Sequence, residues 1–297
     1  MEVPELEALL ERTPYAGLAA SARRVSLKGF EYPDLFRVGG EDGNSYAVKL
    51  RPADQANIAD SLACLAVRKD PEGLIQDYTG TFVVDGWRIL VSPWLEGRQP
   101  IDGGREALPR FFALLARFNR DNPSAGPYTS MYLNGRRYAA IAELVDAEVE
   151  TCLAAIDDGF PGAEAREALG ALKSGLACLV NEDVNTGNMF FARGGKPVFI
   201  DTEWLHSGLN LHQFDHLNLL GFDEEAWYNI TEEARDCYVA YFEALGLPRR
   251  LADEQIRARE LLAVLRQDAY WRWKKEEAKY PESARRARIV LDTPTFI

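Results

Sequence analysis

The sequence predicts an α+β fold of two lobes, an N-terminal antiparallel sheet with a helix and a larger, mostly helical C-terminal lobe. Short apolar runs separated by turn residues fill residues 24–91, which is typical of antiparallel strands. Beyond residue 104 the apolar residues recur at i, i+3 and i+4, which indicates helices. We therefore expect a sheet lobe over residues 1–95 and a helical lobe over residues 96–297.

The composition excludes several classes of protein. The chain has 297 residues, a formal net charge of −12 and 47% hydrophobic residues, which suffices for well-packed cores. The negative charge disfavours nucleic acid as a partner, and no apolar run approaches the roughly 20 residues that cross a bilayer. Four scattered cysteines without a C-x-x-C pair favour free thiols. The sequence thus predicts a cytoplasmic protein without a membrane span, and it indicates no oligomeric state.

The expected elements follow from the apolar pattern and from the turn residues between them. The sheet lobe is expected to contain helices over residues 4–20 and 53–68 and strands over residues 25–30, 34–38, 45–50, 82–85 and 87–91. The helical lobe is expected to contain helices over residues 104–120, 136–157, 163–179, 211–221, 224–246 and 250–279. One hairpin is expected between the third and the fourth of these later helices.

A lysine inside an apolar strand is the first candidate for function. Lys49 lies in Tyr-Ala-Val-Lys-Leu, and burying its charge costs several kcal/mol unless it is paired. Lys49 therefore either faces solvent or meets a phosphate or a carboxylate. On the following helix Asp60 is the candidate carboxylate partner, and Glu72 is the second choice.

A hairpin is predicted around Gly194 and Gly195, because a Gly-Gly centre between two short apolar runs is a strong hairpin signal. With these glycines as a two-residue turn, Asn188 lies opposite Asp201 at the open end. Cross-strand partners hold their Cβ atoms roughly 4.5–5.5 Å apart. An amide oxygen and a carboxylate in this arrangement suit Mg²⁺, which takes oxygen ligands from protein, phosphate and water.

The loop that leads into the hairpin carries Asp183, five residues before Asn188. The order Asp-x-x-x-x-Asn, strand, turn, strand, Asp is that of the catalytic Asp and the two metal ligands of kinases. Taken singly, Asp183, Asn188 and Asp201 are typical turn or strand-end residues. Their joint spacing favours a phosphotransferase site.

Residues 92–97 break the strand pattern and are interpreted as the connection between the lobes. In such a connection the backbone meets the edge of an adenine base and apolar side chains meet its face. Ser92 and Trp94 are the candidates for this contact with the nucleotide. The alternative for Trp94 is ordinary packing.

The residues singled out above stand in the order Lys49, Asp183, Asn188 and Asp201. In this order they make the chain resemble the aminoglycoside phosphotransferase and choline kinase family, the small-molecule branch of the protein-kinase-like fold, over about residues 25–245. The resemblance implies an enzyme that uses ATP and Mg²⁺, in which Lys49 contacts the α- and β-phosphates and Asp183 orients or deprotonates the acceptor hydroxyl. It implies that Asn188 and Asp201 hold the metal. It also makes Asp215 similar to the family's aspartate that hydrogen-bonds the catalytic loop.

The chain departs from the family pattern at two points. Asn181 stands where the family usually has a histidine, two residues before Asp183, and the nucleotide loop around Gly29 lacks a G-x-G-x-x-G. The histidine is mainly architectural, so we expect activity to survive. The glycine-poor loop predicts a looser cover over the triphosphate.

The acceptor is expected to be a small polar molecule, because only 13 residues separate Asp201 from Asp215 and no A-P-E follows. Acidic residues at 223–225 and 232–236 favour a cationic acceptor. His206, His212 and His216 are expected to line or support the acceptor cleft; the i, i+4 spacing of His212 and His216 also occurs in metal sites, but no further Cys or His lies nearby.

Three further residues are candidates for contact with the acceptor. Glu203 shares its strand side with Asp201 and is a candidate for metal or acceptor, the alternative being a solvated strand end. Tyr270 and Trp271 are candidates for holding an amine by cation–π attraction, the alternative being helix packing.

Two other functions stay open on sequence alone. A kinase of a protein or of a lipid-linked sugar is disfavoured by the short segment after Asp201. A nucleotide-binding pseudokinase scaffold is suggested by Asn181 and the glycine-poor loop. Retention of the lysine, both aspartates and the asparagine favours an enzyme.

Overall fold

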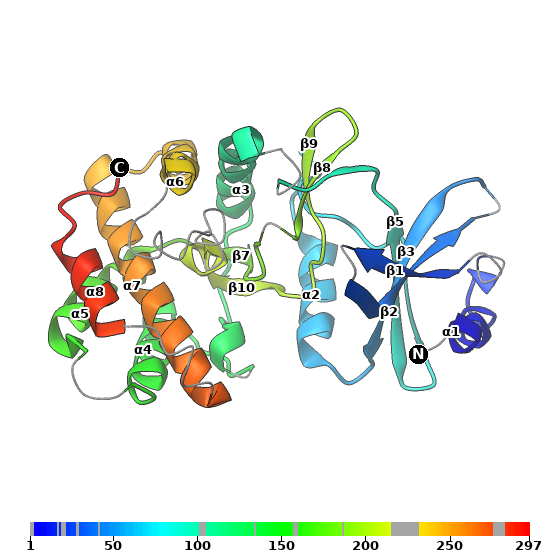
Figure 1. Cartoon of the computed structure of the whole chain (residues 1–297), viewed down its shortest axis with the longest axis horizontal. Coiled ribbons are helices and arrows are strands. Elements are labelled where there is room, and N and C mark those ends of the chain that lie inside the picture. The colour runs from blue at the N-terminus through cyan, green and yellow to red at the C-terminus, as the bar shows by residue number, and fades with distance from the viewer. Residues whose placement is uncertain are drawn as a thin grey trace.

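The computed structural model describes residues 3–16, 18, 22–27, 30–40, 42–100, 105–133, 135–156, 160–185, 187–214, 232–275 and 283–297. Figure 1 shows two parts side by side, a β-sheet with helices α1 and α2 and a region made mostly of helices. Helix α2 lies on the side of the sheet that faces the helical region. The predicted α+β architecture of two lobes is thus confirmed.

The sheet of the N-terminal lobe is antiparallel, with the strand order β1-β2-β3-β5-β4. Its strands are β1 (Arg23–Leu27), β2 (Phe30–Gly39), β3 (Ser45–Pro52), β4 (Gly80–Val84) and β5 (Trp87–Pro93). The central strand is β3. Its Lys49 lies between Leu35 of β2 and Leu90 of β5, so the lysine is carried by the best-supported strand of the sheet.

Helix α1 (Val3–Leu10) is shorter than the expected helix over residues 4–20. It ends where Thr13 Oγ1 donates to the carbonyl oxygen of Leu10, and Pro14 disfavours a helical conformation for the residue before it. The apolar side of α1 covers one face of the sheet. Its side chains share a core with sheet residues: Leu6, Leu9, Leu10, Phe36, Val38, Val48, Leu50, Val84, Ile89 and Val91.

Helix α2 (Ala56–Val67) belongs to both lobes. It follows β3 in the chain, yet it contacts β10 (Leu205–Leu209), and Leu65 joins the core of the helical lobe. A helix held in this way fixes the position of the sheet relative to the helical lobe.

The helical lobe is built around α7 (Arg249–Lys274), a helix of 26 residues. The other helices are α3 (Leu108–Asp121), α4 (Ile141–Leu153), α5 (Gly162–Leu169), α6 (Glu232–Leu245) and α8 (Ser283–Asp292), with short 3₁₀ turns η3 (Arg105–Ala107), η4 (Met131–Leu133), η5 (Gly170–Ser174) and η6 (Asn210–Phe214). Helix α3 packs on α6, and the aromatic rings of Phe112, Phe214 and Tyr238 stack between them.

The expected helix over residues 163–179 is wrong in its second half. The α-helix ends at Leu169, a 3₁₀ turn follows, and Gly175 is extended with ψ of 165°. Strand β7 (Ala177–Asn181) then pairs antiparallel with β10. The apolar run before Asn181 is therefore a buried strand, which periodicity alone does not distinguish from a buried helix. Of the expected helix over residues 211–221, only the part in η6 lies within the described residues.

The predicted hairpin is present, but its register differs by one residue. Strands β8 (Met189–Ala192) and β9 (Lys196–Phe199) pair from Met189↔Phe199 to Ala192↔Lys196, and β6 (Gly97–Arg98) adds a third strand. The loop therefore contains three residues, and both of its glycines have positive φ, 88° and 77°. Asn188 consequently lies opposite Ile200 and not opposite Asp201.

Two predictions about the whole chain can be compared with the structure. All four cysteines are free, and three of them are buried, as expected. Within the described ranges no helix combines the length and the apolar character that crossing a bilayer would require.

Gly97 lies where the chain passes between the lobes, and its neighbours leave no room for a side chain. A Cβ atom there would overlap the carbonyl oxygen of Phe191 on the paired strand β8. We expect Gly97→Ala to lower the free energy of unfolding by about 1–3 kcal/mol, the usual cost of overpacking, measured by denaturant titration. Gly170→Ala is the control, since its φ is −54° and a Cβ there meets nothing within 4 Å. Equal losses in both variants would contradict the prediction.

Candidate functional site

A cavity of about 540 Å³ lies between the sheet lobe and the β8–β9 hairpin. Five residues selected from the sequence line it: Lys49, Ser92, Trp94, Asn188 and Asp201. The other lining residues come mainly from strands β2 and β3, from the connection after β5, from the loop before β4 and from the hairpin with the residues on either side of it. The residues expected to bind nucleotide and metal therefore share one cavity.

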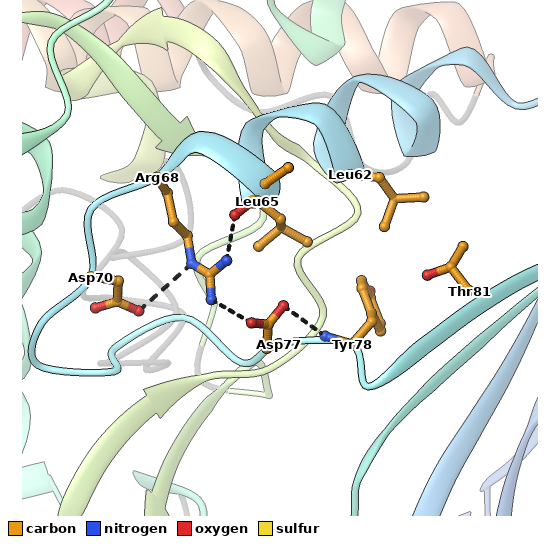
Figure 2. Close-up of a pocket in the computed structure, with 8 residues that line it drawn as sticks. Leu62, Leu65, Arg68, Asp70, Asp77, Tyr78 and Thr81 are labelled. Carbon is orange, nitrogen blue, oxygen red and sulfur yellow. Dashed lines mark hydrogen bonds and ion pairs between the residues drawn. The ribbon is translucent and has the colours of Figure 1, made fainter.

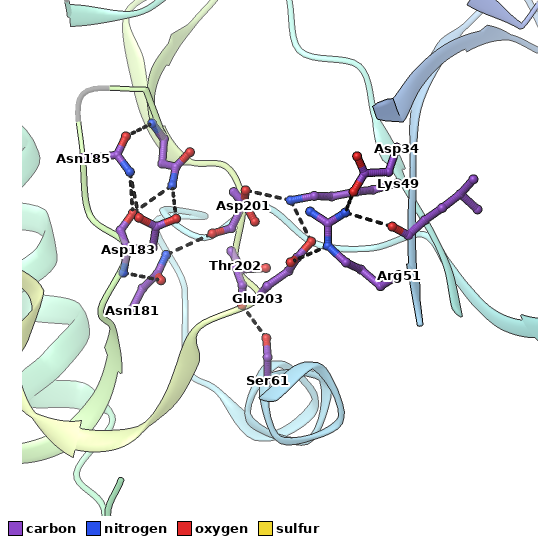
Figure 3. Close-up of polar contacts among 12 residues, drawn as sticks. Asp34, Lys49, Arg51, Ser61, Asn181, Asp183, Asn185, Asp201, Thr202 and Glu203 are labelled. Carbon is purple, nitrogen blue, oxygen red and sulfur yellow. Dashed lines mark hydrogen bonds and ion pairs between the residues drawn. The ribbon is translucent and has the colours of Figure 1, made fainter. Parts of the chain in front are cut away.

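The ammonium group of Lys49 lies between two carboxylates (Figure 3). Nζ is 2.7 Å from Oδ2 of Asp201 and 2.7 Å from Oε1 of Glu203. The Lys49 side chain is only 17% exposed, so these two ion pairs offset the hydration that its charge loses. The strand lysine is thus oriented into the cavity rather than toward solvent.

The prediction that Asp60 on α2 pairs with Lys49 is wrong. Both carboxylate oxygens of Asp60 lie 2.7 Å from Nη2 of Arg137, on the exposed side of the helix. The helix instead turns Asn57 and Ser61, one turn apart on the same face, toward residues 202–203. The side chain of Asn57 donates a hydrogen bond to the carbonyl oxygen of Glu203, and that of Ser61 donates one to the carbonyl oxygen of Thr202.

Glu203, in the segment between β9 and β10, supplies the carboxylate partner of Lys49 that was expected from α2. It is 7% exposed, so it is not a solvated strand end. Its Oε2 lies 2.9 Å from Nε of Arg51, and Arg51 also pairs with Asp34. The sequence analysis missed Arg51, although a residue two positions after Lys49 shares its face of the strand. Two cations therefore lie side by side at the wall of the cavity.

Asparagine side chains hold Asp183, which lies in the loop between β7 and β8 (Figure 3). Nδ2 of Asn185 donates to Oδ1 of Asp183 at 2.8 Å, and Nδ2 of Asn188 donates to Oδ2 at 2.8 Å. Asn188 also donates to the carbonyl oxygen of Asp183. One side chain thus connects the candidate catalytic base to the candidate metal site.

Asn181, the residue in place of the family's histidine, is 1% exposed and joins two segments of the site. Its Nδ2 donates to the carbonyl oxygen of Asp201 at 3.3 Å. Its Oδ1 accepts a hydrogen bond from the backbone N–H of Asp183 at 3.2 Å. Asn181 thereby supplies an architectural connection of the kind expected from the histidine.

The donor set around Asn188 and Asp201 fits a magnesium ion. Asp201 has a φ of 60°, in the left-handed region that aspartate tolerates better than most residues, and from there its carboxylate reaches the cavity. Oδ1 of Asn188 makes no hydrogen bond within the described part of the chain, because Nδ2 makes the contacts with Asp183. No group of three His, Cys, Asp or Glu side chains among the described residues forms a metal site. A cation here would use one amide oxygen, one carboxylate and non-protein oxygens, as Mg²⁺ does beside a nucleotide.

Several polar groups in the connection between the lobes form hydrogen bonds within the protein. The N–H of Trp94 donates to a carbonyl oxygen of β3 at 2.9 Å, and its ring lies 4.8 Å from the guanidinium of Arg37. Ser92 is buried at the end of β5. The Pro93 carbonyl oxygen accepts a hydrogen bond from Nε2 of Gln76 at 2.9 Å. The sequence analysis missed Gln76, because nothing in its loop indicates that it reaches this connection.

A second cavity of about 620 Å³ lies between α2 and β4 (Figure 2). Tyr78 lines both cavities and separates them. Burial raises the pKa of Tyr78, and Oγ1 of Thr202 donates to its hydroxyl at 3.5 Å. Arg68 at the wall of the second cavity is paired with Asp77 at 3.1 Å. The charged side chains in its lining are thus one arginine and the two aspartates that pair with it.

The remaining candidates lie farther along the chain. Tyr270 and Trp271 stand near the C-terminal end of α7, with ring centroids 4.8 Å apart, and Tyr270 is 41% exposed. Asp215 and the acidic residues 223–225 lie outside the described residues. Asp236 is exposed on α6.

His206 and His212 are buried, so they do not line a cleft. His212 lies between two buried glutamates, Glu148 and Glu182. Their buried positions therefore favour a supporting role for His206 and His212 over direct contact with the acceptor. The third histidine, His216, lies outside the described residues.

Neither a protein-family model nor a curated protein sequence matches this chain. Solved structures do. A thermostable mutant of aminoglycoside phosphotransferase APH(4)-Ia, in a ternary complex with AMP-PNP and hygromycin B, is similar with a TM-score of 0.65 and 13% identity, over 98% of this chain and 99% of that chain. An aminoglycoside phosphotransferase from Alicyclobacillus acidocaldarius is similar with a TM-score of 0.57 and 14% identity, over 93% of both chains.

A third structure, the GDP complex of wild-type aminoglycoside 2′-phosphotransferase-IIIa, has a TM-score of 0.57 and 12% identity, over 98% of this chain and 99% of that chain. At these identities the similarity establishes the fold and leaves the activity to the geometry of the site. Because the similarity extends over nearly the whole length of both chains, it includes both lobes. The predicted protein-kinase-like fold is therefore confirmed, and this chain has the fold of the aminoglycoside phosphotransferases.

Proposed function

We propose that this chain is an ATP- and Mg²⁺-dependent phosphotransferase that moves the γ-phosphate to a hydroxyl group of a small polar molecule. The observation that carries the proposal is that Lys49, Asn188 and Asp201 line one cavity, with Asp183 hydrogen-bonded to Asn188. Structures of the same fold were solved with AMP-PNP, ADP or GDP, which supports a nucleotide in this cavity.

The phosphates are proposed to meet the cations of β3. Lys49 is assigned to the α- and β-phosphates, as the family resemblance implies. Arg51 offers a planar guanidinium that matches the oxygen geometry of phosphate, and it shares the strand face of Lys49. Glu203, which is engaged with both cations, is assigned to holding them rather than to binding the acceptor. Arg51 thereby supplies charge where a glycine-rich loop would have supplied backbone N–H groups.

Asp183 is proposed as the base of the reaction. The acceptor hydroxyl oxygen bonds to the γ-phosphorus, the bond from that phosphorus to the β–γ bridging oxygen breaks, and the hydroxyl proton passes to Asp183. Asn185 and Asn188 hold the two carboxylate oxygens in place for this transfer. Asn188 and Asp201 would hold Mg²⁺, which would supply positive charge to the phosphate oxygens.

The acceptor is proposed to carry amino groups. The net charge of −12 disfavours an anionic acceptor, and clefts focus such fields. One solved structure of the same fold contains the aminoglycoside hygromycin B together with AMP-PNP. Tyr270 and Trp271 stay the proposed aromatic contacts. The lobe boundary between residues 95 and 96, the support of the loop by Asp215 and the cytoplasmic location also stay predictions.

An acceptor panel tests the proposed function. ADP production would be measured with aminoglycosides, choline, amino sugars, nucleosides and hydroxy amino acids, and we expect acceptor-dependent turnover with at least one of them. Nucleotide binding without turnover on every acceptor would instead support the nucleotide-binding scaffold.

Asp183→Asn should lower kcat by about 10²–10⁴-fold, the usual contribution of a positioned general base, and leave the nucleotide Kd nearly unchanged. The amide keeps the shape of the side chain but cannot take the proton. Steady-state kinetics and calorimetric titration of ADP measure the two effects. Asp60→Asn is the control, since Asp60 pairs with Arg137 away from the cavity, and it should behave like the wild type. Near-wild-type turnover of Asp183→Asn would remove Asp183 from the mechanism.

Asp201→Asn and Asn188→Ala should separate a charged ligand from a neutral one. Asparagine also tolerates positive φ, so Asp201→Asn changes the charge without straining the backbone. The loss of the carboxylate should abolish most of the Mg²⁺-dependent gain in nucleotide affinity, a loss of about tenfold or more. Asn188→Ala should weaken it less. The measurement is the Kd of AMP-PNP with Mg²⁺ and with EDTA. Identical Mg²⁺ dependence in both variants and in the wild type would rule out this metal site.

An amine acceptor should have a lower KM than its neutral hydroxyl analogue at low salt, and the difference should shrink as salt screens the acidic surface. The comparison needs one aminoglycoside or amino sugar and its deaminated analogue, assayed at two ionic strengths. A preference for the neutral analogue that does not change with salt would contradict the cationic acceptor while leaving phosphoryl transfer in place.

A further inference from the structure

Four ionisable side chains form a buried ion cluster directly behind the loop that carries Asp183. The cluster consists of Glu148 on α4, Glu182 after β7, His212 in η6 and Arg266 on α7. Each of these side chains is at most 1% exposed. Four separate parts of the helical lobe therefore meet at one buried group of charges, in addition to the apolar core that they share.

The imidazole of His212 lies between the two carboxylates. Nδ1 is 2.7 Å from Oε1 of Glu182, and Nε2 is 3.1 Å from Oε2 of Glu148. Each ring nitrogen lies within ion-pair distance of a buried carboxylate without forming a hydrogen bond to it. Two carboxylates at this distance favour a positive charge on the ring, which we therefore assign as an imidazolium. Arg266 contributes the second positive charge, with Nε 2.6 Å from Oε1 of Glu148 and Nη2 3.7 Å from Oε1 of Glu182. The cluster thus balances two carboxylates against two cations.

The protonation of the cluster follows from its contacts. Burial alone lowers the pKa of His212, but Glu148 and Glu182 outweigh it and raise this pKa to about 9, above its ordinary value of 6.5. Burial alone raises the pKa of Glu182, but the cations His212 and Arg266 outweigh it and lower this pKa to about 2. Burial also lowers the pKa of His206, which faces Glu182 from β10 at 3.8 Å. His206 is therefore neutral while His212 is charged.

Within the cluster, Glu182 is the residue that directly precedes Asp183 in the chain. Its side chain also accepts a hydrogen bond from the backbone N–H of Met131. Asn181, the residue before Glu182, hydrogen-bonds to the backbone of Asp201 and of Asp183. The backbone that carries the Asp183 side chain is thus fixed by a buried charge at Glu182 and by an amide at Asn181.

We propose that Glu182 is a positioning residue of this enzyme, which through its ion pair with the imidazolium of His212 holds Asp183 at the distance that phosphoryl transfer requires. This role rests on the proposed phosphotransferase function. Small displacements of a catalytic group are costly, and about 1 Å can cost on the order of 10²-fold in rate.

Proton loss from His212 removes the balance of charge. Glu148, Glu182 and Arg266 would then hold one excess negative charge in the interior, which is unfavourable without a compensating cation. Because the pKa of His212 is raised in the folded state, its contribution to stability is complete below pH 6.5 and is lost as the pH rises through about 9. The position of Asp183, and with it kcat, should follow the same alkaline transition.

Two glutamine variants separate positioning from stability. Glu182→Gln and Glu148→Gln each remove one carboxylate from the same imidazole, and both should lower the melting temperature. Only Glu182 adjoins Asp183, so Glu182→Gln should lower kcat about 10–100-fold with an unchanged nucleotide Kd, and Glu148→Gln should keep kcat within about threefold of the wild type at pH 7. Equal kcat in both variants, whether lowered or not, would overturn the positioning role.

A pH series on the wild type and Glu148→Gln decides the matter even if Glu182→Gln does not fold. In Glu148→Gln the imidazole has lost one of its two carboxylates, so the alkaline limb of kcat should move to lower pH with the same acceptor, and the titration of His212 followed by ¹⁵N NMR should move with it. An alkaline limb that stays in place while the His212 titration moves would overturn the role and leave phosphoryl transfer standing. Absence of wild-type turnover on every acceptor would overturn the proposed function, and this role with it.

Discussion

The ion pairs of Lys49 with Asp201 and Glu203 are the contact on which the arrangement of the site depends. They join the central strand of the sheet lobe to the segment between β9 and β10, so one set of charges both fixes the cations and connects the lobes. Arg51 extends the set through Glu203. Because cations and carboxylates alternate along the cavity wall, each charge is compensated by its neighbours. The geometry of the charged cavity wall and the relative position of the lobes are therefore one property of the fold.

The loop of Asp183 is supported at two neighbouring residues. The carboxylate of Asp183 accepts hydrogen bonds from the side-chain amides of Asn185 and Asn188. The preceding residue, Glu182, lies beside His212 and near Arg266. The loop is thus held by amide hydrogen bonds at Asp183 and by buried charges at Glu182.

Much of the fold could be predicted from patterns that depend on local chemistry. The strands around Lys49, the Gly194–Gly195 hairpin and the helices expected over residues 53–68, 104–120, 136–157 and 250–279 follow from apolar spacing and turn residues, and the structure contains them with shifted ends. The register of the hairpin could not be predicted, because Arg193 joins the two glycines in a three-residue loop and two glycines permit either length. Asp60 was selected because the sequence predicts the helix over residues 53–68 but not which of its faces is turned toward Lys49. The rotation is set by tertiary contacts of Asn57 and Ser61.

The buried ion cluster was missed for a related reason. Residues 177–179 were expected to end a helix. Strand β7, which contains them, pairs with β10 and brings the chain around His212 against Glu182. Sequence separation hides such a contact, since Glu148, Glu182, His212 and Arg266 come from four elements. The histidine was therefore visible in the sequence, but its partners were not.

The cost of that cluster also bears on whether the chain is an enzyme or a scaffold. Buried ion groups are expensive to desolvate, and apolar residues of similar volume in their place are often neutral or stabilising for a fold. A scaffold that only binds a nucleotide needs the cations of β3 and the metal ligands, and it gains nothing from a charge fixed behind Asp183. An enzyme does gain from it, because the carboxylate that takes the proton must be held in one place throughout the reaction. The presence of Glu182 and its partners behind this loop, together with Asn181 in front of it, is therefore more consistent with catalysis than with binding alone.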